Sequence, residues 1–397
     1  MQIKSTLKQL IKNNPLYKDF IRPMRVKLKE KALAKLDDES YFIKRHKQIF
    51  GYTPDFKNPQ TFNEKIIHRI LFDRNPIYTA LADKLKARIY IATTLQHFNP
   101  THNTQDNTIY TTGGGQPYSL NQNNIDLQNN PTLNTTTSTT PQTQHKENTQ
   151  TQHTTDSQLS QKLDSLLFQP IDTLTQELFA TNECQYLPKL YGIYKSVNEI
   201  DFSKLPQSFV LKTNHDCGGV VLVKDKDTFL KDSKTFNEAM TKLTNHLNTN
   251  FYTLYREWHY KDIEPRIFAE EMLLEISENG EAKVPSDYKI HCFGKTQYIQ
   301  VDTDRFVEHT RSIFDENWSV MPMKYLYQLP NIIPNKPEHL NIMLEIARIL
   351  IMSPYLRVDL YNIQGRIVVG ELTFTPEGGT GVFTPQEWDK KLGDLWQ

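Results

Sequence analysis

The stretch RVDLYNIQGRIVVGELTFTP, residues 357–376, carries charged side chains inside two otherwise apolar segments. The glycine-containing segment 363–365 between them predicts a β-hairpin with a three-residue loop. Residues two apart on a strand point to the same face. Arg357, Asp359 and Tyr361 are therefore expected on one face of the first strand, away from its apolar residues.

Two acidic side chains of this hairpin are expected to face one site. In the predicted register Asp359 lies opposite Val369 and Arg357 lies opposite Glu371, with Thr373 on the same face as Glu371. Asp359 and Glu371 are then diagonal neighbours, roughly 7–8 Å apart. Two such carboxylates repel each other unless a cation lies between them, and Mg²⁺ binds one or two carboxylates together with phosphate oxygens and water. The alternative is an Arg357–Glu371 ion pair with Asp359 solvated.

Composition indicates a folded protein with a sizeable core. The chain has 397 residues, 38% hydrophobic, with no net formal charge, and its length suggests two or three domains. The cysteines Cys184, Cys217 and Cys292 are too widely spaced for a metal-ligand pattern, which is typical of a reducing compartment. The first residues lack an apolar signal core, and no run approaches the ~18 apolar residues of a transmembrane helix. We therefore expect a cytoplasmic protein.

Residues 1–50 are strongly basic, with thirteen Lys or Arg against five Asp or Glu. Apolar residues recur there at helical spacing, which predicts a basic helical N-terminal region. Such helices could rest on an anionic membrane surface or bind an acidic polymer; a solvated helical face is the alternative. Nucleic acid is not an expected partner, because no recognisable nucleic-acid module accompanies the charge.

Composition also divides the chain. Residues 51–96 and 163–205 have helical apolar spacing, and Thr61 is a candidate helix N-cap. Residues 97–162 consist largely of Asn, Thr, Gln and Ser, which predicts a disordered insertion. From Phe209 onward, strands and helices alternate without regular βαβ spacing, which predicts an α+β fold with mostly antiparallel sheets.

A second informative stretch is FVLKTNHDCGGVVLVKD, residues 209–225. A short apolar strand ends at Lys212, and a polar turn with Gly218 and Gly219 leads into a second strand. Glycines let backbone amides approach an anion, and a lysine supplies a point charge for phosphate. The GKS/T signature of a Walker P-loop is absent. Taken alone, the pattern is also typical of many surface hairpins.

Two flanking motifs extend this pattern. Asp83 and Lys84 open a helix and could add a second lysine facing phosphate. In RIFAEEML, Glu270 and Glu271 end an apolar strand, where backbone groups could read an adenine edge and a carboxylate could bind ribose hydroxyls. A pair of exposed glutamates is the alternative interpretation.

The order of these motifs resembles the ATP-grasp superfamily, especially its D-alanine–D-alanine ligase-like branch. Within that branch it is most similar to the TupA-like ATP-grasp proteins of bacterial surface-polysaccharide clusters. The resemblance runs from about Gly51 to Gln397, apart from the insertion. It is carried by FNEKI, DK, LKTNHDCGG, REWHYKDIEPRIFAEE, DYKIHCF, QVDTDRF, RVDLY, GELTFTP and TPQEWDKKLG.

The resemblance implies two α+β subdomains that grip ATP. It makes residues 51–96 and 163–205 a domain that precedes the ATP-grasp unit. Residues 206–270 would form the small subdomain, and residues 271–397 the large subdomain with the Mg²⁺ site.

The resemblance also implies residue roles. Lys84 and Lys212 would hold the α- and β-phosphates, and Arg357 would steady the transferring phosphoryl group. The remaining nucleotide-binding roles would fall to the lid loop with His215, Asp216, Gly218 and Gly219, to Glu270, Glu271 and Leu273 at the adenine, and to Glu275 or Glu278 at the ribose. Asp359 and Glu371 would bind Mg²⁺, with Thr373 as a weaker ligand where the superfamily often has Asn. Lys289, Arg305 and Arg311 would face phosphate or substrate.

The implied activity is that of a carboxylate–amine ligase. ATP would phosphorylate a substrate carboxylate, and an amine would then displace phosphate from the acyl phosphate, modifying a surface-glycan precursor. Three alternatives stay open at this point. They are a glycosyltransferase, for which DTD at 302–304 matches a DxD string, an ATP-grasp sugar kinase, and a non-catalytic binding module.

Overall fold

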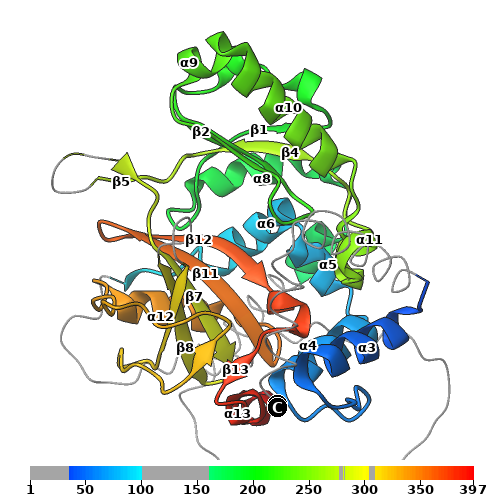
Figure 1. The fold of residues 1–397 in the computed structure, drawn as a ribbon. Coiled ribbons are helices and arrows are strands. Elements are labelled where there is room, and N and C mark those ends of the chain that lie inside the picture. Colours follow the sequence, from blue (N-terminus) through cyan, green and yellow to red (C-terminus); the bar gives the residue numbers. More distant parts are fainter. Residues whose placement is uncertain (1–34, 101–160, 277–279, 281, 304–308) are drawn as a thin grey trace, which may run out of the picture.

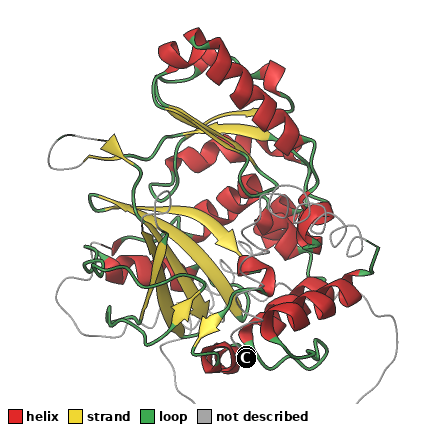
Figure 2. Cartoon of the chain, in the orientation of Figure 1, coloured by secondary structure: helices red, strands yellow, loops and turns green. Residues whose placement is uncertain are grey.

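The computed structural model describes residues 35–100, 161–276, 280, 282–303 and 309–397. Two main antiparallel sheets with helices packed on them, and two short strand pairs, make up this part of the chain (Figures 1 and 2). The α+β prediction is thereby confirmed. The predictions for the chain before residue 35, for residues 101–160, and for Glu278 and Arg305 concern positions outside the described residues.

The smaller of the two main sheets has four strands in the order β1 (Leu190–Tyr194), β4 (Ile267–Glu270), β2 (Phe209–Thr213) and β3 (Val220–Val223). Helices α9 (Lys226–Lys231) and α10 (Ser233–Leu247) pack on its outer side, at the top of Figure 1. Alternate strand residues such as Leu211 and Ala269 join Phe229 and Leu243 in one apolar core. The sheet includes β1, which precedes the range 206–270 predicted for this subdomain.

The larger sheet has five strands in the order β12 (Arg366–Thr373), β11 (Tyr355–Ile363), β7 (Asp287–Phe293), β8 (Thr296–Thr303) and β9 (Thr310–Phe314). Leu356, Val358 and Leu360 of β11 are fully buried on the face covered by α12 (Leu340–Ile349). Arg357 and Asp359 alternate with them, so β11 presents its charged side chains on the opposite face. This is the face at which the site is built.

The terminal hairpin differs from the predicted one in loop and register. Gln364 and Gly365 alone form the turn, with φ of 52° and 91°; a two-residue turn with both φ positive suits the twist of a hairpin. The pairing then shifts at Gly370, where a β-bulge places Asp359 directly opposite Glu371. The predicted three-residue loop and diagonal register were wrong.

The bulge also corrects which side chains share a face. Val369 pairs with Leu360 and is buried in the main core, so it does not share a face with Glu371 as expected. Gly370 is required at the bulge, because a Cβ there would lie 2.8 Å from the Tyr361 ring. The bulge therefore brings the two carboxylates closer than the sequence pattern suggested, since partners in direct register are nearer than diagonal ones.

Helices near both ends of the described chain pack against the larger sheet. α4 (Phe62–Leu71) begins at Thr61, which forms a capping box with Glu64, as the predicted cap requires. Phe62 packs against Tyr355 and against Trp396, which follows α13 (Glu387–Leu395). The core of the larger sheet thus contains residues from both ends of the described chain.

The remaining elements connect these layers. Between the sheets, α8 (Thr175–Ala180) contacts β1 and α6 (Lys84–Thr94) contacts β12 (Figure 1). The other elements are α3 (Asp38–Phe50), α5 (Ile77–Ala82), α11 (Phe251–Tyr255), the strand pairs β5 (Glu275–Ile276)–β6 (Ala282–Lys283) and β10 (Lys324–Tyr325)–β13 (Phe383–Thr384), and short 3₁₀ segments that include η7 (Trp258–Tyr260) and η8 (Pro376–Gly379). Among the helices described, none has the length and apolar character needed to cross a bilayer.

Candidate active site

A cavity of about 360 Å³ is lined by residues of both sheets and of α6. Its volume lies in the range of small-molecule sites. Among the described residues, every site residue predicted from the sequence lines it except His215, Glu275, Arg311, Arg357 and Thr373. The predicted residues that do so are Lys84, Lys212, Asp216, Gly218, Gly219, Glu270, Glu271, Leu273, Lys289, Asp359 and Glu371.

Lys212 is held at the cavity wall by a buried carboxylate. Its Nζ lies 2.5 Å from Glu270 Oε1, and Arg88 approaches the other oxygen of Glu270 at 3.4 Å. Glu270 is only 5% exposed, so the alternative of an exposed glutamate pair is wrong for this residue. Glu270 therefore orients Lys212 through one oxygen. Arg88, which sequence reasoning missed, lies beside the other oxygen and helps to balance the negative charge of the carboxylate.

Glu271 is held differently. Its two oxygens accept hydrogen bonds of 2.7 and 2.9 Å from Arg366, and these hydrogen bonds lower the pKa of the Glu271 carboxyl. Its backbone N–H donates to the Lys189 carbonyl. The carboxylate is therefore bound to the hairpin arginine. Glu275, the described candidate for the ribose, lies in β5 and pairs with Lys283 at 3.3 Å.

The glycine-containing loop after β2 is fastened at Asp216. The carboxylate of Asp216 accepts hydrogen bonds from the Thr213 hydroxyl and binds His246 of α10, and its backbone carbonyl accepts one from Lys84 Nζ at 2.5 Å. A Cβ at Gly219 would lie 1.8 Å from the Thr213 hydroxyl, so only glycine fits there. The loop tip at Gly218 is exposed at the cavity.

His215 does not take part in this cavity. It is 2% exposed, and neither ring nitrogen has a hydrogen-bond partner among the described residues. Burial lowers the pKa of its imidazole, which favours the neutral ring. His215 therefore belongs to the predicted loop only by its backbone, and its side chain is buried in the protein away from the cavity.

Asp359 is ionised and held by two cations. Arg357 donates to both of its oxygens at 2.6 and 2.8 Å, and Lys289 Nζ lies 2.6 Å from one of them. Lys289 also contacts Asp287 at 2.5 Å. Burial acts to raise the pKa of Asp359, but the charges of Arg357 and Lys289 outweigh it and lower the pKa to about 2. The carboxylate is therefore charged at neutral pH.

Glu371 is the more accessible carboxylate of the pair, with a side chain 33% exposed. One oxygen accepts a hydrogen bond of 2.8 Å from the Thr373 hydroxyl and lies 3.4 Å from Arg357. The predicted Arg357–Glu371 contact thus exists, but Asp359, which the alternative interpretation left solvated, is the main partner of the arginine. Thr373 reaches the cavity only through these two side chains.

The acidic pair fits a hard cation that brings its own ligands. The described residues contain no group of three or more His, Cys, Asp or Glu placed to hold a metal ion by themselves. Asp359 and Glu371 lie directly opposite each other and line one cavity. Two carboxylates suit Mg²⁺ when phosphate oxygens and water complete its shell.

Comparison with protein families agrees with this arrangement. The family described as TupA-like ATP-grasp matches residues 177–397, which is more than half of the chain. The chain belongs to the TupA-like ATP-grasp family. The matched range contains every predicted site residue except Lys84. A search among curated proteins finds no match to this chain.

Solved structures that resemble this TupA-like ATP-grasp protein are distant. A D-alanine–D-alanine ligase from Bacillus anthracis complexed with ATP is 16% identical over 50% of this chain and 57% of its own, with a TM-score of 0.27. An L-amino acid ligase from Bacillus licheniformis is 15% identical over 51% of this chain and 43% of its own, with a TM-score of 0.30. A D-alanine–D-alanine ligase from Helicobacter pylori is 15% identical over 56% and 59%, with a TM-score of 0.27. In each case the match covers less than two thirds of the other protein.

The TupA-like ATP-grasp protein has a second cavity, of about 490 Å³, beside the first. Cys217, Tyr260, Lys289 and Glu371 line both cavities and so form the wall between them. After the roles proposed for them in the next subsection, the first cavity is called the nucleotide cavity and the second the acceptor cavity. Aromatic and charged side chains of the acceptor cavity include Phe42, Arg45, Phe251, Tyr255, Glu257, Asp302, His309, Arg311, Tyr327, Arg357 and Glu377.

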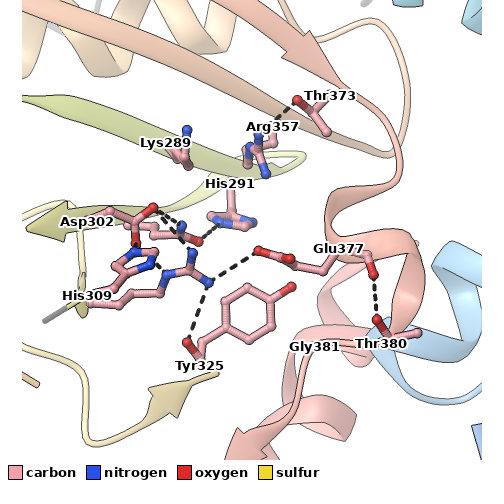
Figure 3. A network of polar contacts seen from close by, with 12 residues as sticks. Lys289, His291, Asp302, His309, Tyr325, Arg357, Thr373, Glu377, Thr380 and Gly381 are labelled. Atoms are coloured by element: carbon pink, nitrogen blue, oxygen red, sulfur yellow. Dashed lines mark hydrogen bonds and ion pairs between the residues drawn. The ribbon is translucent and has the colours of Figure 1, made fainter. Parts of the chain in front are cut away.

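One wall of the acceptor cavity is a polar network, shown in Figure 3. Arg311 contacts Asp302 at 2.5 and 3.3 Å and Glu377 at 3.5 Å, and its guanidinium lies over the Tyr327 ring at 4.8 Å. Arg357 lies on the side of this network nearer Thr373, to which it donates a hydrogen bond of 3.0 Å. Asp302, part of the DxD string, is thus bound to Arg311 in the wall.

Several residues of the two cavities were missed in the sequence. Asp287 precedes Lys289 by two residues in DYK, a spacing that places both on one strand face and could have revealed their contact. Glu257 lies within the quoted REWHY motif, but its surroundings depend on the fold. Phe42 and Arg45 come from α3, outside the family match, and no local pattern marks them.

Proposed function

We propose that this protein is an Mg²⁺- and ATP-dependent ligase that joins a carboxylate to an amine through an acyl phosphate. The observation that carries the proposal is the convergence of Lys212 from one sheet and the Asp359–Glu371 pair from the other on one cavity. A triphosphate needs both cationic groups and carboxylates that share a metal ion with it. Membership of the TupA-like ATP-grasp family supports the same proposal.

In this proposal the nucleotide cavity holds ATP. Lys84, Lys212 and the loop amides near Gly218 bind phosphate, since lysine and glycine-rich backbone both suit anions. The segment around Leu273 receives the adenine. Asp359 and Glu371, supported by Thr373, would hold Mg²⁺, which would supply positive charge to the phosphates.

The protein contributes positioning and charge rather than a nucleophilic side chain. Arg357 lines the acceptor cavity and contacts both carboxylates of the acidic pair, so it can steady a phosphoryl group at the shared wall. A substrate carboxylate bound in the acceptor cavity attacks the γ-phosphorus, and ADP leaves. An amine then attacks the acyl carbon, and phosphate leaves.

The biological acceptor is also part of the proposal. On the family resemblance, the substrate is a precursor of a bacterial surface polysaccharide. The basic N-terminal region, residues 1–50, of which residues 1–34 lie outside the described part of the chain, would hold the enzyme near an anionic membrane surface. A sugar kinase is a second candidate, because Tyr255, Tyr260 and Tyr327 line the acceptor cavity and could stack on a sugar ring. The DxD string gives little support for a glycosyltransferase, since its first aspartate, Asp302, forms an ion pair with Arg311.

The test is product analysis with purified protein. The protein is incubated with Mg²⁺-ATP, a panel of amino acids and uronic acids, and hydroxylamine, which converts acyl phosphates to hydroxamates. ADP, phosphate and hydroxamate in equal amounts would support the ligase. ADP with a phosphorylated sugar and no free phosphate would support the kinase, and turnover of a nucleotide sugar without ATP would refute both.

A pair of matched variants ties the activity to the site. Glu371→Gln removes the accessible carboxylate of the acidic pair and is expected to abolish Mg²⁺-dependent ADP formation. Glu238→Gln changes an exposed glutamate of α10 and should leave the rate unchanged. Equal rates in the two variants would remove Glu371 from the proposed metal site.

A further inference from the structure

A buried glutamate of the acceptor cavity is not used in the mechanism above. Glu257 lies between α11 and η7, is 7% exposed and lines the acceptor cavity. One of its oxygens, Oε2, accepts a hydrogen bond from the Thr375 hydroxyl. The other oxygen lies near η8, where a Cβ added at Gly378 would be 3.8 Å from it.

Glu257 differs from the other carboxylates of the cavity in its partners. Asp302 and Glu377 contact Arg311, and Glu371 contacts Arg357. For Glu257, the ion pairs of the described residues include only His259, whose Nε2 is 3.9 Å away. Burial, and then the charges of nearby arginines, lower the pKa of His259 to about 3, so this imidazole is neutral. A buried carboxylate without a short contact to a cation is unfavourable.

The position of Glu257 relates it to the transfer chemistry. Glu257 lines the acceptor cavity. A wall that includes Tyr260 and Glu371 separates this cavity from the nucleotide cavity, the proposed site of ATP. In the proposed ligase, the carboxylate substrate is bound in the acceptor cavity, so the amine that attacks its acyl phosphate approaches from that cavity. Such an amine enters as an ammonium ion, because aliphatic amines are protonated at neutral pH. It must lose a proton before its nitrogen can attack.

We infer that Glu257 binds the ammonium group of the second substrate and accepts the proton that this group must lose before attack. This inference rests on the proposed ligase. The Glu257 carboxylate takes one proton from R–NH₃⁺ and becomes a carboxylic acid, and R–NH₂ remains. The nitrogen lone pair forms a C–N bond to the acyl carbon, the C–O bond to phosphate breaks, and the departing phosphate takes the second proton of the nitrogen.

The local charges are compatible with this role. Burial raises the pKa of Glu257 to about 7, although the Thr375 hydrogen bond and Arg45 of α3 oppose the shift. A proton acceptor works best when its pKa lies near the working pH. The titratable or charged groups around it come from five parts of the fold. They are Arg45 of α3, His259 and Tyr260 of η7, Cys217 of the loop after β2, Glu371 of β12 and Glu377 of η8.

The test compares the reaction of a nucleophile that is neutral at pH 7 with the reactions of amines that are protonated at that pH. Hydroxylamine is largely neutral at pH 7 and needs no proton acceptor, whereas ammonia, methylamine and the amino acids are almost wholly protonated. Hydroxamate and amide formation are measured with these probes, Mg²⁺-ATP and the carboxylate panel, for the full chain and for Glu257→Gln. Gln keeps an oxygen for the Thr375 hydroxyl but cannot take a proton.

With protonated amines, we expect Glu257→Gln to lower the rate of amide formation by about 10²–10⁴-fold. Hydroxamate formation should change by less than about threefold on the same physical ground, since that nucleophile needs no base. The wild-type rate should rise with pH until about pH 7, where the base is ionised. The difference in amide-forming rate between wild type and variant should shrink as the pH approaches the pKa of the amine, because more of the amine is then already neutral.

Other outcomes overturn the inference. Equal losses with hydroxylamine and protonated amines would assign Glu257 a structural role, and no loss with either would remove it from the reaction. Wild-type hydroxamate without amide from any protonated amine would also refute it. Wild-type protein that forms no hydroxamate would refute the ligase proposal itself, and the inference with it. If Glu257→Gln does not fold, Glu257→Asp is measured in its place. The rate of amide formation with protonated amines should then fall by a smaller factor, and the rate of hydroxamate formation should not change.

Discussion

Replacement of Asp359 by Asn should destabilise the protein even without nucleotide. Asp359 is buried and is the shared partner of Arg357 and Lys289, with contacts of 2.6 to 2.8 Å. Asn keeps the shape but removes the charge. Two buried cations would then have lost their common counterion, so the variant is not a fold-neutral probe of metal binding.

The magnitude follows from the shifted pKa. The pKa of Asp359 falls from 3.8 to about 2 in the folded protein. At about 1.4 kcal/mol per unit, this corresponds to about 2 kcal/mol of stability at pH 7. Breaking a buried pair by removing one partner commonly costs about 3–5 kcal/mol. We therefore expect Asp359→Asn to lower the free energy of unfolding by about 2–5 kcal/mol.

Glu371→Gln is the matched control. The Glu371 side chain is a third exposed and lies 3.4 Å from Arg357, so we expect a loss below about 1 kcal/mol. Urea unfolding followed by tryptophan fluorescence at pH 7, without nucleotide or metal, measures both variants. Because a depressed carboxyl pKa stabilises the protein above its unfolded value, the deficit of Asp359→Asn should narrow as the pH falls from 5 toward 3. Equal losses in the two variants, or a deficit that widens in acid, would refute this account of the cationic contacts.

Three further predictions concern the cavities. Glu257→Gln should raise the free energy of unfolding by up to about 3 kcal/mol at pH 8, with the gain disappearing near pH 5, because the raised pKa of about 7 makes the ionised carboxylate destabilising; thermal melts across this range would show the opposite sign if the group were stabilised as an anion. Gly219→Ala should weaken ATP binding at least about tenfold in calorimetry and also lower the melting temperature, since a Cβ there meets the Thr213 hydroxyl at 1.8 Å and displaces the loop; unchanged affinity would exclude the loop from ATP binding. Lys212→Met should weaken ATP binding by about 10–100-fold and leave Glu270 paired with Arg88, so unchanged affinity would exclude Lys212 from phosphate binding.

Much of the fold could be predicted because its signals are local. Short stretches of sequence are enough to predict the helix cap at Thr61, the alternation of apolar and charged residues around Val358, and the order of the motifs. The register of the terminal hairpin was not, because a bulge at Gly370 and a two-residue turn at Gln364 each shift the pairing by one residue. Both depend on the conformation that two glycines allow, and the residue pattern alone does not select it.

The site was predicted by residue type more successfully than by partner. Most predicted residues line the nucleotide cavity, but the sequence could not show that Arg88 holds Glu270 or that Lys289 holds Asp359. These pairs join segments far apart in the chain. The same reason hides Arg45, since nothing near it in the sequence indicates that α3 reaches the acceptor cavity.

The packing of the N-terminal helices bears on how this protein can be divided for experiments. Asn63 of α4 exchanges hydrogen bonds with Gly381, and its backbone N–H donates one to the Asp389 carboxylate. Arg69 donates to the carbonyls of Tyr355 and Phe374. A fragment trimmed to the matched range 177–397 would uncover the aromatic surface that Phe62 seals and leave these buried carbonyls without donors. The autonomous folding unit therefore begins well upstream of that boundary, and expression trials should retain α3 and α4.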